Sequence, residues 1–187
     1  IKKGKTTVDL MAGMGECWKY ILKNSNQNSI LIALDFSTEM IRRAKKKKLK
    51  YGSQKIEILK ENVFNNSIKS NLADYVISGF GLKTFNNVQL ESLALEINRI
   101  LKPNGTFSLI DVSVPNNKIS TVFYMFYLKK IIPILGSPEN YKMLGVYTEE
   151  FKNSRNVHEI FENQNFEIEY VEYFFGCGSG IKGKKKG

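Results

Sequence analysis

The stretch Thr6-Thr7-Val8-Asp9-Leu10-Met11-Ala12-Gly13-Met14-Gly15 decides the fold class of this 187-residue chain. Its first half is a short run of β-forming residues, and it ends in a turn that contains Gly13 and Gly15. A helix is expected to begin near Glu16 and to direct Trp18 toward the interior. A strand that passes through a glycine-containing turn into a helix is the first unit of many α/β folds that bind a nucleoside.

Downstream, apolar runs alternate with helical patterns. Residues 30–34 are apolar throughout, which is typical of a strand that is covered on both faces. Ser37 is a suitable N-cap for the next helix, residues 88–101 are apolar at a helical period, and residues 103–105 predict a turn. The strands expected in this part are residues 6–11, 30–34, 56–59, 73–78 and 106–112. Their order predicts a parallel sheet with helices on both faces.

The last third of the chain has a different pattern. Residues 122–135 are apolar almost all round, so this segment is expected to be a deeply buried helix or to line a lipophilic cavity. A helix is expected over residues 149–163 and a strand over 166–175, and the glycine-rich residues 176–181 are expected to form an irregular edge strand. The whole pattern predicts a single domain over residues 1–187 with a doubly wound, mostly parallel seven-stranded sheet.

The charge of the chain is strongly positive, at a formal +10 from 28 Lys and Arg against 18 Asp and Glu. Lysines gather in residues 2–5, 45–50 and 182–186, and such runs attract phosphate backbones or anionic lipid. Most such runs are solvated faces, so a nucleic acid is the weaker candidate partner and peripheral contact with a membrane stays open.

The cysteine content indicates a reduced environment, and the hydropathy predicts no membrane-spanning helix. The two cysteines, Cys17 and Cys177, are too few for a disulfide framework and match no metal-ligand spacing, which predicts a cytoplasmic location and no metal. No apolar stretch reaches the roughly 18 residues of a membrane-spanning helix. The chain starts at Ile1 without a signal-peptide pattern, so we expect it to be a fragment.

An acidic residue after the second strand completes a nucleoside-binding pattern. Asp35 lies 20 residues beyond Gly15, a spacing at which a carboxylate can accept hydrogen bonds from both hydroxyls of a ribose. Asp35 could also cap the next helix, and Asp9 could bind loop amides, so each residue alone also has a structural interpretation. The two together at strand ends favour a ligand site.

The charges around the turn distinguish three nucleoside cofactors. A dinucleotide site needs a third glycine where Trp18 stands, and Glu16 would repel a pyrophosphate at the helix N-terminus. A P-loop is excluded because no Gly-Lys-Ser or Gly-Lys-Thr follows. S-adenosylmethionine carries a sulfonium and an ammonium, which Asp9 and Glu16 would attract.

Several motifs carry a family resemblance. Residues 8–15, Leu34-Asp35-Phe36-Ser37 with Met40, and Ser78-Gly79-Phe80-Gly81-Leu82-Lys83 resemble the ubiquinone/menaquinone-biosynthesis C-methyltransferases, and residues 96–105 and 126–136 with Tyr141 are similar as well. The resemblance implies a class I methyltransferase fold, with residues 114–150 as an insertion on the substrate side. It also implies N-terminal cap helices that this sequence lacks, and Lys83-Thr84 stands where an Arg-Asn pair is usual.

The resemblance also assigns site residues. It implies that Gly13 and Met14 lie against the methionine part of the cofactor and that Asp35 binds the ribose. Asp9, Gly15 and Phe36 are the further candidate cofactor-binding residues of these motifs. Asn62 and Val63 would hold the adenine, and Gly79 would lie beneath the sulfonium. No catalytic base is assigned; Tyr141 and His158 are the weak candidates.

The expected function is thus S-adenosylmethionine-dependent methylation of a small, lipophilic acceptor such as a demethylated quinol. Two alternatives stay open. The positive charge would suit an RNA or protein methyltransferase, and the missing cap would suit a catalytically silent nucleoside-binding protein.

Overall fold

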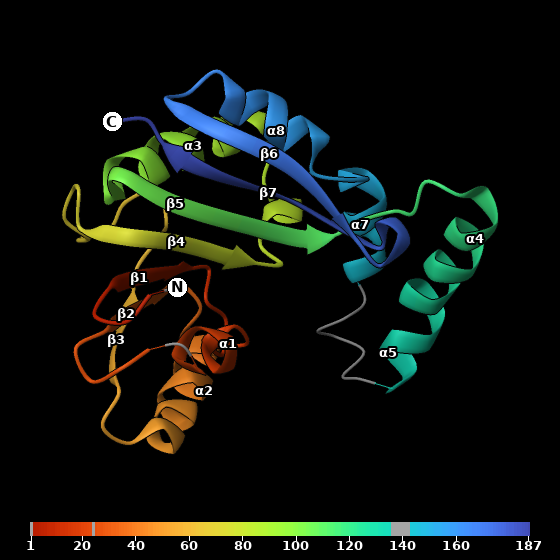
Figure 1. The fold of residues 1–187 in the computed structure, drawn as a ribbon. Coiled ribbons are helices and arrows are strands. Elements are labelled where there is room, and N and C mark those ends of the chain that lie inside the picture. Colours follow the sequence, from red (N-terminus) through yellow and green to blue (C-terminus); the bar gives the residue numbers. More distant parts are fainter. Residues whose placement is uncertain (1, 24, 136–142) are drawn as a thin grey trace.

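The computed structural model describes residues 2–23, 25–135 and 143–187, and a single seven-stranded sheet forms its centre (Figure 1). The strands lie in the order β3-β2-β1-β4-β5-β7-β6. Strands β1 to β5 pair in parallel, whereas β7 is antiparallel to β5 and β6. Their bounds are β1 Thr6–Leu10, β2 Ile30–Asp35, β3 Lys55–Lys60, β4 Ala73–Gly79, β5 Leu101–Val112, β6 Phe166–Tyr173 and β7 Gly178–Lys185. The predicted doubly wound, mostly parallel sheet is confirmed.

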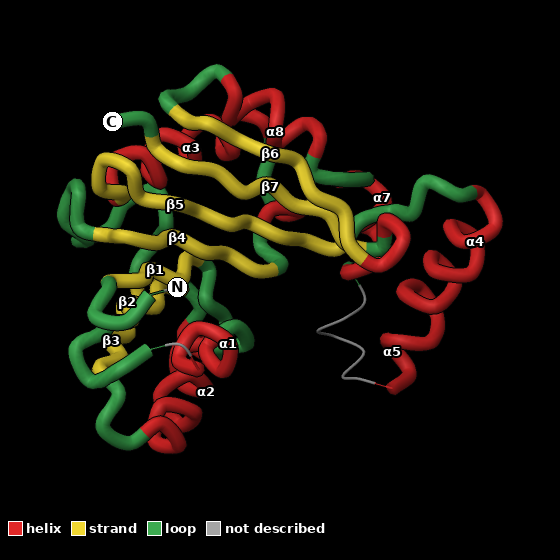
Figure 2. Tube along the Cα trace, viewed as in Figure 1, coloured by secondary structure: helices red, strands yellow, loops and turns green. Residues whose placement is uncertain are grey.

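Helices cover both faces of this sheet, as the alternation of elements predicts. α1 (Trp18–Lys23) and α2 (Thr38–Lys48) lie over β1 to β3, and α3 (Asn87–Ile100) and α8 (Arg155–Glu162) pack together on the opposite face (Figures 1 and 2). The remaining described α-helices are α4 (Lys118–Phe126), α5 (Ile132–Leu135) and α7 (Leu144–Phe151).

Strand β2 separates two apolar cores. Leu31 and Ala33 pack with Trp18 of α1, while Ile32 and Leu34 join the core beneath α3 and α8. Because successive side chains of a strand point to opposite faces, four consecutive buried residues require cover on both sides. The prediction made from the apolar run is therefore confirmed.

The predicted helix over residues 149–163 is wrong, because the chain forms two helices there. α7 ends at Phe151 and α8 begins at Arg155, and between them Lys152 has a φ of 58°, which ends the helical hydrogen-bond ladder. The break is anchored in the sheet, since the backbone N–H of Ser154 donates to Oγ of Ser179 at 2.8 Å.

The expected irregular edge strand at residues 176–181 is also wrong. β7 is a regular strand between β5 and β6, and β6 forms the edge. A Cβ on Gly180 would lie 2.2 Å from the carbonyl oxygen of Leu109, and one on Gly183 would lie 2.6 Å from a methyl of Ile168. The glycines permit close approach of the neighbouring strands. Glycine within a strand can mark such a close approach as well as an irregularity.

The predicted turn at residues 103–105 lies within β5 rather than before it. Ala73 pairs with Leu101 and Tyr75 with Thr106, so residues 102–105 bulge out of the ladder. Asn104 adopts a φ of 63° in this bulge, a conformation that asparagine tolerates better than most residues.

The expected deep burial of residues 122–135 is wrong for α4. No residue of α4 is buried, and in the π-helical turn Tyr127–Ile131 that follows it Leu128 enters the interior. Figure 1 shows α4 and α5 beyond the carboxyl end of β5, away from α3 and α8. None of the helices in the described ranges is both long and apolar enough to cross a bilayer.

Candidate active site

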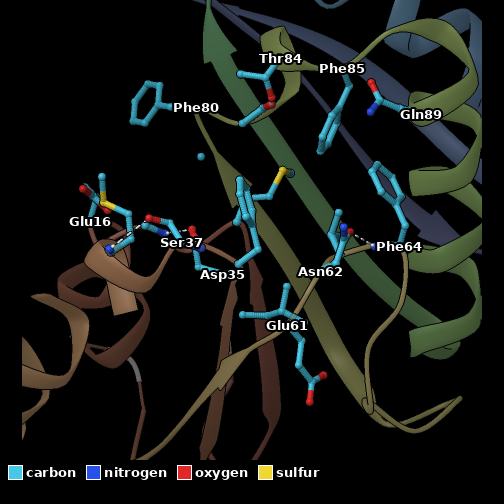
Figure 3. A pocket seen from close by; sticks show the side chains of 18 residues that line it. Glu16, Asp35, Ser37, Glu61, Asn62, Phe64, Phe80, Thr84, Phe85 and Gln89 are labelled. Atoms are coloured by element: carbon cyan, nitrogen blue, oxygen red, sulfur yellow. Dashed lines mark hydrogen bonds between the residues drawn. The ribbon is translucent and has the colours of Figure 1, made fainter. Parts of the chain in front are cut away.

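A cavity of about 640 Å³ opens at the carboxyl ends of β1 to β4 (Figure 3). It lies where the connections of the sheet reverse direction, between β1 and β4, which is where ligands of open α/β sheets bind. Its volume suits a small-molecule ligand. The lining residues lie at or after the ends of these four strands: Met11, Gly13, Glu16, Leu34, Asp35, Phe36, Ser37, Met40, Glu61, Asn62, Val63, Phe64, Gly79, Phe80, Gly81, Thr84, Phe85 and Gln89.

The turn after β1 has a left-handed backbone at three positions. Met11, Gly13 and Gly15 have φ values of 55°, 55° and 85°. A Cβ on Gly15 would lie 2.5 Å from the ring of Trp18, and one on Gly13 would lie 2.9 Å from Oε2 of Glu16. The close neighbours of both glycines are thus side chains of the protein itself. The turn extends further than predicted, and α1 begins at Trp18 rather than at Glu16.

Asp35 ties the ends of β1 and β2 together. Its Oδ2 accepts a hydrogen bond from the backbone N–H of Gly13, and its Oδ1 accepts one from that of Ser37, both at 2.8 Å. These bonds fix the carboxylate at the cavity wall, next to Glu16 and Ser37 (Figure 3). Each carboxylate oxygen has a second lone pair, so Asp35 can still accept hydrogen bonds from a ligand.

Asp9 lies directly behind the glycine turn and is almost completely buried. Burial raises the pKa of its carboxyl to about 8; Glu16 and Asp35 add to the rise, whereas the Trp18 indole and Lys47 oppose it. Among the described residues its Oδ2 finds no hydrogen-bond partner. A cationic ligand group bound beside the turn would favour the ionised form of this carboxyl and would also be attracted by Glu16 and Asp35.

The opposite wall of the cavity is apolar and aromatic. The rings of Phe64 and Phe85 lie 5.1 Å apart, and Figure 3 shows both across the cavity from Asp35. Oδ1 of Asn62 accepts a hydrogen bond from the backbone N–H of Phe64 at 2.9 Å and so fixes this loop. Glu61 turns away from the centre, and its carboxylate binds Ser67.

The loop after β4 forms one side of the cavity and is bonded to β5. The backbone N–H of Phe80 donates to the carbonyl of Ile110 at 2.8 Å, although Phe80 has a φ of 69°. Nζ of Lys83 contacts the carbonyl oxygen of Phe80 and lies 2.9 Å from Oδ1 of Asp111. Beneath this loop, Met11 fills the space next to Gly81.

Six of the nine residues assigned to the cofactor line this cavity, namely Gly13, Asp35, Phe36, Asn62, Val63 and Gly79. Asp9, Met14 and Gly15 are not among the lining residues but belong to the same turn. Of the two weak candidates for catalysis, His158 lies on α8, away from the cavity, and Tyr141 falls outside the described residues.

The sequence interpretation did not single out the aromatic wall. Phe64 and Phe85 follow β3 and β4, and Gln89 belongs to the first turn of α3, where it forms a capping box with Asn86. The signal that could have found them is their place: the residues just after the carboxyl end of each parallel strand meet at one edge of the sheet.

The chemistry of these walls fits S-adenosylmethionine. The carboxyl groups of Glu16 and Asp35 line the cavity at the glycine turn, where they can face a sulfonium and an ammonium, and Asp9 lies buried behind them. The apolar wall suits a flat adenine ring. The thiol of Cys17 does not compete as a nucleophile, because burial first of all, together with Asp9 and Glu16, raises its pKa to about 11.

Comparison with known proteins agrees with this geometry. The sequence model of the ubiE/COQ5 methyltransferase family matches residues 1–185. The chain is 31% identical to a demethylmenaquinone methyltransferase of Oceanobacillus iheyensis, over 99% of this chain and 79% of the relative. It is 30% identical to the enzyme of the same name from Lactococcus lactis, over 93% and 71%.

Solved structures agree on the fold. A SAM-dependent methyltransferase from Aquifex aeolicus superposes with a TM-score of 0.71 at 22% identity, over 98% of this chain and 84% of that one. At this identity the likeness is one of fold.

Proposed function

The chain belongs to the ubiE/COQ5 methyltransferase family, and from that premise we propose that it methylates a ring carbon of a demethylated quinol. The reaction class follows from the family: the chain is an S-adenosylmethionine-dependent methyltransferase that acts on a small acceptor. The quinol is inferred from the relatives, two of which are demethylmenaquinone methyltransferases.

The observation that carries this proposal is the division of the cavity into two walls. Carboxyl groups surround the glycine turn on one side, and Phe64 and Phe85 form the other. Phe36 and Phe80 also line the cavity, yet both are largely exposed, so they lie at its mouth. A cationic cofactor suits the first wall, and a flat, lipophilic ring that enters past exposed aromatic side chains suits the mouth.

In this proposal each residue of the turn has a role in binding. Asp9, Gly13, Met14 and Gly15 hold the methionine part, and Asp35 binds the ribose. Asn62 and Val63 contact the adenine, Phe36 covers the ribose side, and Gly79 lies beneath the sulfonium.

The bound cofactor supplies a methyl group on a positively charged sulfur, which is already an activated leaving group. The protein's task is then alignment, which can lower the barrier by up to about 7–11 kcal/mol for well-held reactants. Methylation of the ring carbon also releases a proton from the acceptor, and no histidine lines the described part of the cavity. Water is the candidate to accept that proton.

The test begins with calorimetry of S-adenosylmethionine binding, followed by methyl transfer to demethylmenaquinol. Asp35→Ala should weaken cofactor binding at least about tenfold, a loss of 1.4 kcal/mol. The matched control Glu169→Ala, on the exposed face of edge strand β6, should bind normally.

If the wild-type chain binds no cofactor, the entire proposal is overturned. If it binds cofactor but methylates RNA and not the quinol, the acceptor is wrong and the reaction class stands.

A further inference from the structure

Helix α4 presents an apolar stripe to solvent. Ile119, Val122, Phe123 and Phe126 are between 58% and 72% exposed, and they follow one another at the i, i+3, i+4, i+7 spacing of a single helix face. The helix is held from another side, because the hydroxyl of Tyr124 donates to the carbonyl of Cys177 at 3.1 Å. The stripe is thus a fixed feature of the surface.

Two further aromatic residues protrude at the turn between β6 and β7. Phe174 and Phe175 are 82% and 99% exposed and have φ values of 51° and 57°. A left-handed backbone is costly for bulky side chains, and here the cost is not offset by burial. Residues held in such sparsely populated backbone regions cluster at functional sites.

The turn and the helix adjoin. A Cβ on Gly176 would lie 3.3 Å from Cα of Pro115, in the segment that leads into α4, and Asn116 donates from its amide to Glu172 at the end of β6. We call the six exposed residues the apolar rim: Ile119, Val122, Phe123, Phe126, Phe174 and Phe175.

The charge of the segment that carries helix α4 is positive. Residues 112–135 contain three lysines and no acidic residue, and the nearest carboxylate of β6, Glu172, accepts a hydrogen bond from Asn116. Lys118 lies one helical turn before Val122 and so on the same side of α4. Lys129 contacts Glu149, so Lys118 and Lys130 are the better probes of this charge.

We propose that the apolar rim docks on an anionic lipid bilayer, with its aromatic side chains among the headgroups and its lysines on the lipid phosphates. Apolar area and attraction of lysines to anionic lipid are the two contributions that hold a protein at a bilayer surface. A second copy of the chain is a poorer occupant, because a self-complementary contact would bring the same lysines together at a net charge of +10.

Docking by the apolar rim has a consequence for the reaction. α4 follows β5, and β5 pairs with β4. β4 ends at Gly79, which lines the cavity together with the next residue, Phe80. The bilayer would therefore lie at the same edge of the sheet as the cavity. This consequence rests on the proposed lipophilic acceptor, whereas the docking itself does not.

The test is co-sedimentation of the whole chain with vesicles of equal parts phosphatidylglycerol and phosphatidylcholine. Phe174→Ser with Phe175→Ser should weaken binding at least about tenfold, and so should Val122→Ser with Phe123→Ser. Lys118→Gln with Lys130→Gln should weaken it severalfold, and pure phosphatidylcholine vesicles should bind little. The matched control is Leu49→Ser with Leu95→Ser, which removes two exposed apolar side chains elsewhere and should have no effect.

The inference is overturned if the wild-type chain fails to bind anionic vesicles or if the rim variants bind as well as the control. A concentration-dependent dimer that the Val122→Ser, Phe123→Ser variant abolishes, without vesicle binding, would assign the rim to a second copy and also overturn it. Methylation of a short-chain, water-soluble quinol separates the two proposals, because rim variants should retain it. Vesicle binding without any quinol methylation would overturn the acceptor alone.

Discussion

Nζ of Lys83 lies 2.9 Å from Oδ1 of Asp111, and the two side chains are only 7% and 0% exposed. The backbone N–H of Lys83 donates to the other carboxylate oxygen at 3.0 Å. The same ammonium contacts the carbonyl oxygen of Phe80, whose backbone is left-handed. One buried ion pair therefore holds the cavity-lining loop after β4 against the end of β5.

Removal of one partner of this pair should destabilise the protein strongly. Lys83→Met leaves the Asp111 carboxylate buried without its ammonium, which typically costs about 3–5 kcal/mol. Burial raises the pKa of Asp111, and Lys83 together with backbone hydrogen bonds opposes the rise, so loss of the ammonium leaves the burial uncompensated. The double variant Lys83→Met with Asp111→Leu should recover most of the loss. Urea unfolding of the four proteins measures both effects.

The exposed ion pair between Lys182 and Glu169 is the control for this cycle. Its replacement Lys182→Met should change the free energy of unfolding by less than about 1 kcal/mol. A Lys83→Met variant as stable as Lys182→Met would contradict the assigned role of the buried pair.

We expect Asp9 to lower the stability of the folded protein and to contribute to cofactor binding. Burial raises its pKa from 3.8 to about 8, so between these values the folded state holds a proton that the unfolded state has released. Stability therefore falls as pH rises from about 4 to about 8 and changes no further through this group above 8. Asp9→Asn cannot ionise, so it removes this loss and should stabilise the protein relative to the wild-type chain at pH 8.

Thermal unfolding of both proteins between pH 5 and pH 9 tests this expectation; the advantage of Asp9→Asn should grow up to about pH 8, near the raised pKa, and then level off. At pH 9, where the Asp9 carboxyl of the wild-type chain is ionised, cofactor affinity should be lower in the variant, because the neutral amide does not attract a cation. A variant that is less stable at every pH, with unchanged affinity, would contradict both parts.

Gly15 should tolerate substitution much less than Gly4, although both have a left-handed backbone. Gly4, with a φ of 72°, has open space around its Cβ position, so Gly4→Ala should cost only the conformational penalty of about 1–2 kcal/mol. At Gly15 a Cβ would also lie 2.5 Å from the ring of Trp18, which is completely buried. Gly15→Ala should therefore cost more, and chemical denaturation of the two variants would show no difference if the Trp18 contact were unimportant.

The sequence predicted the parts of the fold that depend on local patterns. The apolar run of β2 and the Ser37 cap, which accepts from the backbone N–H of Met40, were both readable because a strand buried on two faces and an N-cap have local signatures. The same holds for Asp35, whose spacing from Gly15 follows from the length of one helical crossover.

Long-range relationships could not be read in this way. The glycines of β7 suggested an edge strand, and only its pairing with Leu109 and Ile168 shows that they admit close neighbours. The apolar run of α4 suggested burial, because hydropathy alone does not say whether a partner surface exists. The Lys83–Asp111 pair joins residues 28 positions apart that neither pattern nor spacing connects.

The contact between Met11 and Gly81 should control the size of the cofactor cavity. Gly81 has φ −103° and ψ −22°, which alanine adopts freely, so backbone strain does not oppose Gly81→Ala. A Cβ there would lie 2.6 Å from Sδ of Met11, which lines the cavity, and the displaced side chain should move into the space of the cofactor. We expect Gly81→Ala to weaken binding of S-adenosylhomocysteine about tenfold in calorimetry, as a misplaced core group of this size costs 1–3 kcal/mol. The double variant Gly81→Ala with Met11→Ala should restore most of the affinity, because the short side chain removes the clash; a double variant as weak as Gly81→Ala alone would show that Gly81 acts in some other way.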